Sequence, residues 1–149
     1  MNEALIQKIT GAFRDVKLEE GIGLSEADAI DNYETDDVKA SCRQRDEKEN
    51  WSFITSADLN KYHSALSFFD AKGMRFHLPA FMIAELKGEF FFGMAFALTH
   101  LSDYSKAQFA ALNEEQRKAV REFLCWLDTN RDYEYNKPHI ESALKDYWI

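Results

Sequence analysis

Residue types suited to acid–base chemistry gather in one stretch of the chain. Arg75 and His77 are two positions apart, and three carboxylates are close to them in sequence: Asp70, Glu85 and Glu89. The residues around the pair alternate between apolar and polar, which predicts a short strand with both side chains on one face. A histidine held among such charges can have a shifted pKa and act as a general acid or base. The alternative is an ion-pair network that anchors a turn and a helix.

The rest of a catalytic set is missing from the sequence. No nucleophile motif, phosphate-binding loop or glycine elbow accompanies the pair. The histidines and cysteines fall at spacings that match no zinc motif: His63, His77, His100, His139, Cys42 and Cys125. We therefore expect no metal and no cofactor, and binding is favoured over catalysis.

An uneven distribution of charge is the most informative feature of the sequence. Between Glu19 and Asp37 stand eight acidic residues and no Lys or Arg, so this segment alone carries a charge equal to the net −8 of the whole chain. Charge patterning reports on association and solubility rather than on fold. The two interpretations are a solvated face that aids solubility and a docking surface for a charged partner.

Apolar residues interleaved with the carboxylates favour docking. A mixture of apolar anchors and charge is typical of a surface on which a complementary partner binds. The predicted partner-binding residues are Glu26, Asp28, Ile30, Asp31, Tyr33, Glu34, Asp36 and Asp37. The partner expected from their charge is a basic protein, such as a toxin or nuclease domain.

The preferred hypothesis is therefore a non-enzymatic bacterial inhibitor of the immunity or antitoxin kind, which covers a basic surface of its partner. One alternative is a small enzyme that uses Arg75 and His77. Another is a self-associating structural protein, because three consecutive aromatic residues, Phe90–Phe92, cannot all face inward on a strand. The sequence leaves the oligomeric state open.

Composition also excludes some classes of partner. An acidic chain lacks the clustered Lys and Arg that bind nucleic-acid phosphates. The longest uncharged run, Phe90 to Leu101, is too short to cross a membrane as a helix. The first residues do not resemble a secretory signal, so we expect a cytoplasmic protein.

Hydrophobic periodicity predicts a single domain over residues 1–149 that is mainly α, with a helix-rich α+β fold as the alternative. The clearest helix is Glu114 to Leu127, which Asn113 and Gln116 begin as a capping box. We also expect a helix that begins near Leu5, one with Ser25 as its N-cap residue, and one that begins at Pro138. The architecture is a helical bundle with at most a small β-hairpin around 74–78 and 90–93.

Two further predictions concern a proline and a charged segment. Pro79 is placed as the first residue of a helix that ends at Gly88. Within the acidic segment 19–50, residues 36–50 carry dense charge of both signs and little apolar content, which predicts either a solvated helix or a mobile connection.

The central motif also resembles a family. The runs Leu66–Asp70 and Gly73–Met82, followed by Phe109 to Leu124, are similar to the centre of an uncharacterised bacterial family of short domains. The resemblance covers roughly Trp51 to Trp148 and consists largely of packing residues. It implies a bacterial cytosolic protein and transfers no catalytic residue.

Overall fold

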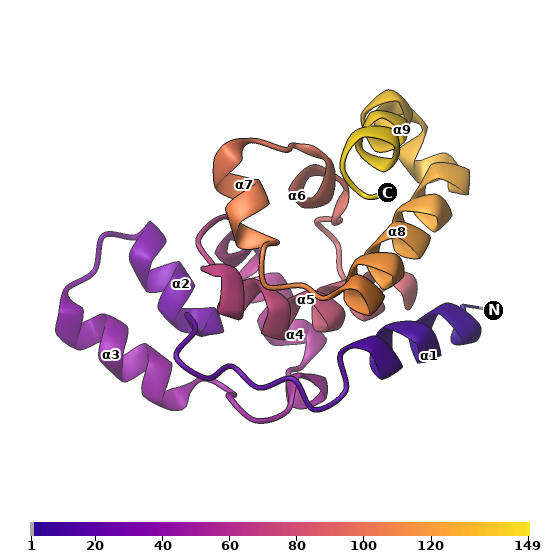
Figure 1. Ribbon diagram of the computed structural model, residues 1–149. Helices are drawn as coiled ribbons and strands as arrows, with labels where there is room; N and C mark the ends of the chain where they lie inside the picture. The colour runs from indigo at the N-terminus through magenta and orange to yellow at the C-terminus, as the bar shows by residue number, and fades with distance from the viewer. Residues whose placement is uncertain (1) are drawn as a thin grey trace.

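The computed structural model describes residues 2–149, and within that range the chain is built from helices without a strand (Figure 1). This confirms the mainly α class. The α-helices are α1 (Glu3–Ala12), α2 (Leu24–Asp31), α3 (Asp36–Arg45), α4 (Ser56–Lys61), α5 (Ala71–Leu86), α6 (Ala95–Thr99), α7 (Asp103–Gln108), α8 (Glu114–Thr129) and α9 (Lys137–Asp146). Three short 3-10 helices join them: η1 (Trp51–Phe53), η2 (His63–Ser67) and η3 (Arg131–Asn136).

Helix α5 forms the centre of the molecule. Asp70 caps its start by accepting a hydrogen bond from the Gly73 N–H at 2.9 Å. Twelve of its sixteen residues are buried, so most of the helix circumference is covered, while Lys72 and Arg75 near its start reach the surface. Figure 1 shows α5 in the middle, with α2 and α3 on one side and α1, α8 and α9 on the other.

The β-hairpin predicted around 74–78 and 90–93 is wrong for the described residues. Residues 74–78 belong to α5, and 90–93 form a loop. The alternating pattern led to the wrong prediction because it assigns His77 to a solvent-facing side, whereas the ring is fully buried. Pro79 likewise lies inside α5 instead of starting a helix. There it removes one backbone donor and its ring crowds the Arg75 carbonyl, and the burial of the surrounding apolar side chains offsets these costs.

The predicted capping box of α8 is confirmed. Asn113 accepts from the Gln116 N–H at 2.8 Å, and the Gln116 side chain accepts from the Asn113 N–H at 3.0 Å. The buried stripe of this helix packs against α1 and α9. The Gln116 amide also donates to the Ala12 carbonyl at 3.2 Å, which ties α8 to the end of α1.

Residues 36–45 adopt the solvated helix of the two alternatives predicted for 36–50. Helix α3 has no buried residue and packs against α2. Thr35 caps it by accepting from the Val38 N–H at 3.3 Å. Its acidic residues stand in the first turn and its arginines in the last, an order that the helix dipole favours.

Two helical glycines provide a matched test of how tightly α5 is packed. A Cβ on Gly73 would lie 2.6 Å from the Ile22 carbonyl oxygen, whereas a Cβ on Gly11 of α1 would meet nothing within 4 Å. Gly11→Ala should raise the free energy of unfolding by up to about 1 kcal/mol, because alanine is the better helix former. Gly73→Ala should lower it by about 1–3 kcal/mol, because the backbone contact cannot be kept. Urea denaturation measures both, and a stabilising Gly73→Ala would contradict this packing.

Candidate functional site

Helices α2 and α3 form a hairpin on which all the predicted partner-binding residues lie. Residues 26, 28, 30 and 31 are on α2, residues 33 and 34 are in the turn, and residues 36 and 37 are in the first turn of α3. At its base the Asp46 carboxylate accepts from the backbone N–H groups of Ser25 and Glu26 at 2.9 and 3.0 Å. Asp46 directly follows α3, so this carboxylate caps the start of α2 and holds the two helices together.

The N-cap residue of α2 differs from the predicted one. Gly23, and not Ser25, is the N-cap residue, and the Glu26 carboxylate accepts from the Gly23 N–H at 2.9 Å. A Cβ on Gly23 would overlap with Asp46, so the capping carboxylate needs a glycine at this position.

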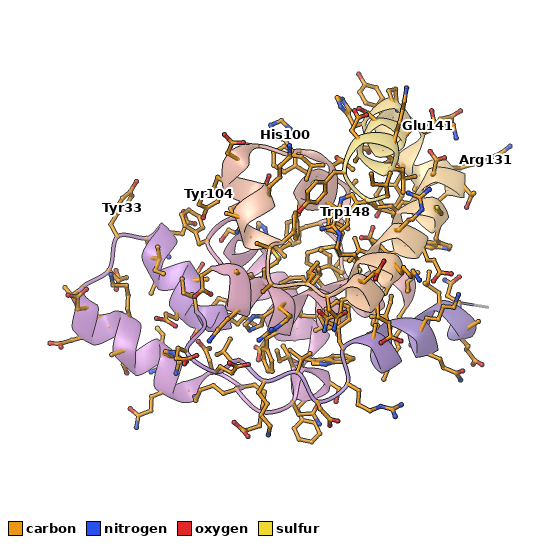
Figure 2. All side chains as sticks on the ribbon, in the orientation of Figure 1. Tyr33, His100, Tyr104, Arg131, Glu141 and Trp148 are labelled. Atoms are coloured by element: carbon orange, nitrogen blue, oxygen red, sulfur yellow. The ribbon has the colours of Figure 1, made fainter. Side chains whose placement is uncertain are left out.

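The turn between the two helices projects an aromatic ring into solvent. Tyr33 is 96% exposed and has a φ of 56°, a left-handed conformation that bulky residues seldom adopt. Figure 2 shows its side chain pointing away from the rest of the molecule. Ile30, by contrast, is half-buried.

The acidic residues divide into two groups. Glu19 and Glu20 pair with Lys72, with nitrogen–oxygen distances of 3.2 and 2.6 Å, and Glu19 also pairs with Arg75 at 2.9 Å. The hydrogen bond from Lys72 lowers the pKa of the Glu20 carboxyl. These two residues therefore attach the connector before α2 to α5, and their charge is offset within the molecule.

Further along the segment, two predicted binding residues also have cationic neighbours. Asp36 pairs with Lys39 at 3.1 Å, and Glu26 lies 3.6 Å from Arg43. The other four carboxylates make no ion pair within residues 2–149: Asp28, Asp31, Glu34 and Asp37. We call these four residues together with Tyr33 the acidic tip.

The position of Asp28 and Asp31 is unfavourable for the helix that carries them. Both lie in the last turn of α2, where backbone carbonyls already concentrate negative charge, and this turn contains no basic residue. The Asn32 amide donates to Asp28 at 3.3 Å, which offsets a part of that repulsion. Carboxylates at this place do not serve the stability of α2.

The predicted pairing of Arg75 and His77 on one strand face is wrong. On α5, residues two positions apart point about 200° apart around the helix axis. Arg75 reaches the surface and pairs with Glu19, whereas His77 is fully buried and stacks on Phe69 with ring centroids 4.3 Å apart. The two side chains therefore do not form one acid–base cluster.

His77 has the environment of a core residue. Its Nδ1 lies 2.7 Å from the Gly73 carbonyl oxygen, so Nδ1 carries a proton and donates, and Nε2 has no partner. Burial lowers the pKa of His77 to about 4, because the charged imidazolium would lose its hydration. The ring is neutral over the physiological range.

Glu85 is a buried carboxylate that the sequence did not single out from its neighbours. Only 6% of the residue is exposed. Its Oε1 accepts from the Met94 N–H at 2.7 Å, and Oε2 has no partner. Burial raises the pKa of Glu85 to about 7, although the bond from Met94 opposes the shift. The side chain fixes the loop that carries Phe90–Phe92 to the end of α5.

A groove beside this loop has a volume of about 420 Å³. It lies between η2, α6 and α7. The rings of six residues line it: His63, Phe90, Phe92, Phe96, His100 and Tyr104. We call it the aromatic groove. Four of these rings recur at every fourth position from Phe92 to Tyr104, and His63 of η2 joins them from a distant part of the sequence.

Neither a metal-binding cluster nor a membrane-spanning helix is found in residues 2–149. No three His, Cys, Asp or Glu side chains among residues 2–149 lie close enough together to hold a metal ion. Over the same range, every helix is too short or too polar to span a bilayer.

The model of a family of unknown function, DUF6714, matches residues 1–149. The chain belongs to this family. The match confirms an uncharacterised family and extends beyond the stretch from Trp51 to Trp148 that carries the resemblance. No curated protein and no solved structure matches the chain.

This DUF6714 protein has two buried ionisable groups, Glu85 and His77, and their protonation has opposite effects on stability. Glu85 binds a proton more tightly when folded, so its contribution is complete below pH about 4.5 and is lost as the pH rises through about 7. His77 binds a proton less tightly when folded, so its contribution is complete above pH about 6.5 and is lost as the pH falls through about 4. Each effect amounts to about 3 kcal/mol, and the two nearly cancel between pH 4.5 and 6.5.

Single substitutions should separate the two effects. Glu85→Gln keeps an acceptor for the Met94 N–H, and its free energy of unfolding should rise from pH 4 to 6.5 by about 3 kcal/mol, through His77 alone. His77→Phe keeps the stacked ring, and its free energy of unfolding should fall by a similar amount from pH 4.5 to 7, through Glu85 alone.

Urea denaturation across this pH range measures both slopes relative to the unsubstituted chain, which controls for groups common to all three. If the free energy of unfolding changes with pH in the same way in all three proteins, neither buried group has the shifted pKa described above.

Proposed function

We propose that this chain is a non-enzymatic binding protein whose acidic tip docks on a basic surface of a partner protein. The observation that carries the proposal is the placement of four carboxylates without ion pairs, two of them at the unfavourable end of α2, around an exposed aromatic ring. Opposite charge would accelerate the encounter, and Tyr33 would supply an apolar anchor.

The kind of partner follows from this charge. Carboxylates pair well with the Lys and Arg groups that hold phosphate in toxins and nucleases, so occupying them would block a substrate. We therefore place the chain among bacterial, cytoplasmic inhibitors of the immunity or antitoxin kind. The rest of the predicted set, Glu26, Ile30 and Asp36, supports the tip by capping, packing and local pairing.

The two alternatives fare differently. A small enzyme based on Arg75 and His77 would need the two side chains in one cluster. Arg75 is instead paired at the surface, and His77 is buried. Self-association keeps a physical basis, because Phe91 and Phe92 are 80% and 58% exposed. Sizing and light scattering over a range of concentrations would detect a dimer.

Charge reversal at the acidic tip should separate binding from stability. Asp31→Lys with Glu34→Lys should weaken binding of a basic partner by about tenfold to a hundredfold and flatten its salt dependence. Asp31→Lys places a cation at the end of α2 and should leave the free energy of unfolding unchanged or raise it by about 0.3–1 kcal/mol. Affinity capture from the host, followed by titration calorimetry of the purified pair at several salt concentrations, measures the effect.

The matched control is Asp132→Lys with Glu134→Lys, which changes the net charge equally at two exposed positions of η3. This pair should leave affinity nearly unchanged. If both double reversals weaken binding equally, only net charge matters and no docking site exists at the tip. Capture of partners that are not basic would also count against the proposal.

A further inference from the structure

Several aromatic rings of the aromatic groove are exposed to solvent. Phe96 is 66% exposed, Tyr104 is 59% exposed and Phe92 is 58% exposed. Phe92 stacks on His63 with ring centroids 3.6 Å apart, and Phe96 stacks on His100 at 4.5 Å. Rings that pack side by side around a groove and remain in contact with water are typical of a recognition surface.

The lining of the groove selects for an uncharged side chain. None of the residues that line it is an Asp, Glu, Lys or Arg. The Tyr104 hydroxyl donates to the Ser67 carbonyl at 2.8 Å, and the Gln108 amide donates to the Leu66 and Phe69 carbonyls at 3.1 and 2.8 Å. With these polar groups already engaged, an aromatic or large aliphatic group fits the groove better than an ion does.

The groove and the acidic tip belong to connected elements. Helix η2 forms one wall of the groove and packs directly against α2, which carries Asp28 and Asp31. In Figure 2, Tyr33, Tyr104 and His100 follow one another along the same side of the molecule. One extended segment of a partner can therefore reach both surfaces.

From these contacts we infer that the aromatic groove receives an aromatic side chain from the same basic segment whose Lys or Arg residues contact the acidic tip. This inference rests on the proposed function and specifies the partner chemistry: an aromatic residue flanked by basic residues. The cations would supply rapid encounter, and the buried ring would supply retention, as in interfaces where few central residues carry most of the binding energy.

Charge complementarity favours this occupant over a second copy of the chain. Each copy carries a net charge of −8, so two copies repel one another. Repulsion of this kind disfavours association, while a basic segment gains attraction from the same field.

The test uses three synthetic peptides of equal length and the isotopically labelled full chain, with binding followed by NMR. The first peptide alternates lysine with tryptophan, the second has alanine in place of each tryptophan, and the third has glutamate in place of each lysine. The lysine–tryptophan peptide should shift amide signals both at the tip, around 31–37, and at the groove, around 92–104. The lysine–alanine peptide should shift the tip signals alone and bind at least about tenfold more weakly.

Two protein variants provide the matched comparison. Phe96→Ser removes an exposed ring from the groove, and Phe53→Ser removes a ring of similar exposure, 70%, that lies on η1 outside the groove. Phe96→Ser should reduce the affinity for the lysine–tryptophan peptide to that of the lysine–alanine peptide. Phe53→Ser should leave it unchanged.

The outcomes distinguish the inference from the proposed function. Equal binding of the two lysine peptides, or an unaffected Phe96→Ser variant, would overturn the role of the groove while binding at the tip persists. Failure of both lysine peptides to bind would overturn both ideas. Groove signals that respond equally to the glutamate–tryptophan peptide, or to protein concentration without any peptide, would replace the basic segment by an uncharged ligand or a second copy.

Discussion

The Asp70 carboxylate accepts two backbone hydrogen bonds through one oxygen, from Gly73 at 2.9 Å and from Ile22 at 2.9 Å. The first bond begins α5, and the second holds the connector that leads into α2. Because Gly73 has no side chain, the connector can approach α5 closely enough for both bonds to form. The position of the α2–α3 hairpin, and therefore of the acidic tip, depends on this junction between the central helix and the chain before α2.

The structure assigns different tasks to neighbouring charges of one sequence segment. Glu19 and Glu20 are attached to α5 by Lys72, and Glu26 and Asp46 cap α2. The four carboxylates of the acidic tip make no ion pair in the described part of the chain. The first group contributes to folding. Of the last group, Asp28 and Asp31 oppose the helix dipole of α2, and a binding role gives a physical reason for their presence.

Local signals in the sequence were sufficient where a helix carries its own cap and stripe. Helix α8 is the clearest case, because Asn113 and Gln116 satisfy each other's backbone groups and the buried positions recur at helical spacing. Helix α5 was misjudged because a short apolar run fits a strand or a buried helix equally well, and Pro79 suggested the start of a new helix. Its burial depends on distant segments, which periodicity does not report. The partners of Glu19 and Glu20, and the wall that η2 adds to the aromatic groove, have the same long-range origin.

The acidic tip and the aromatic groove lie on one side of the molecule, and we propose that a basic partner binds there. Hydrogen–deuterium exchange of the chain, alone and in complex with a basic protein captured from its host, locates the surface that the partner covers. We expect slower exchange in the complex at the α2–α3 turn and across η2, α6 and α7, with no change on α8 and α9. Protection confined to α8 and α9, with the turn exchanging as fast as in the free protein, would show that the partner binds elsewhere.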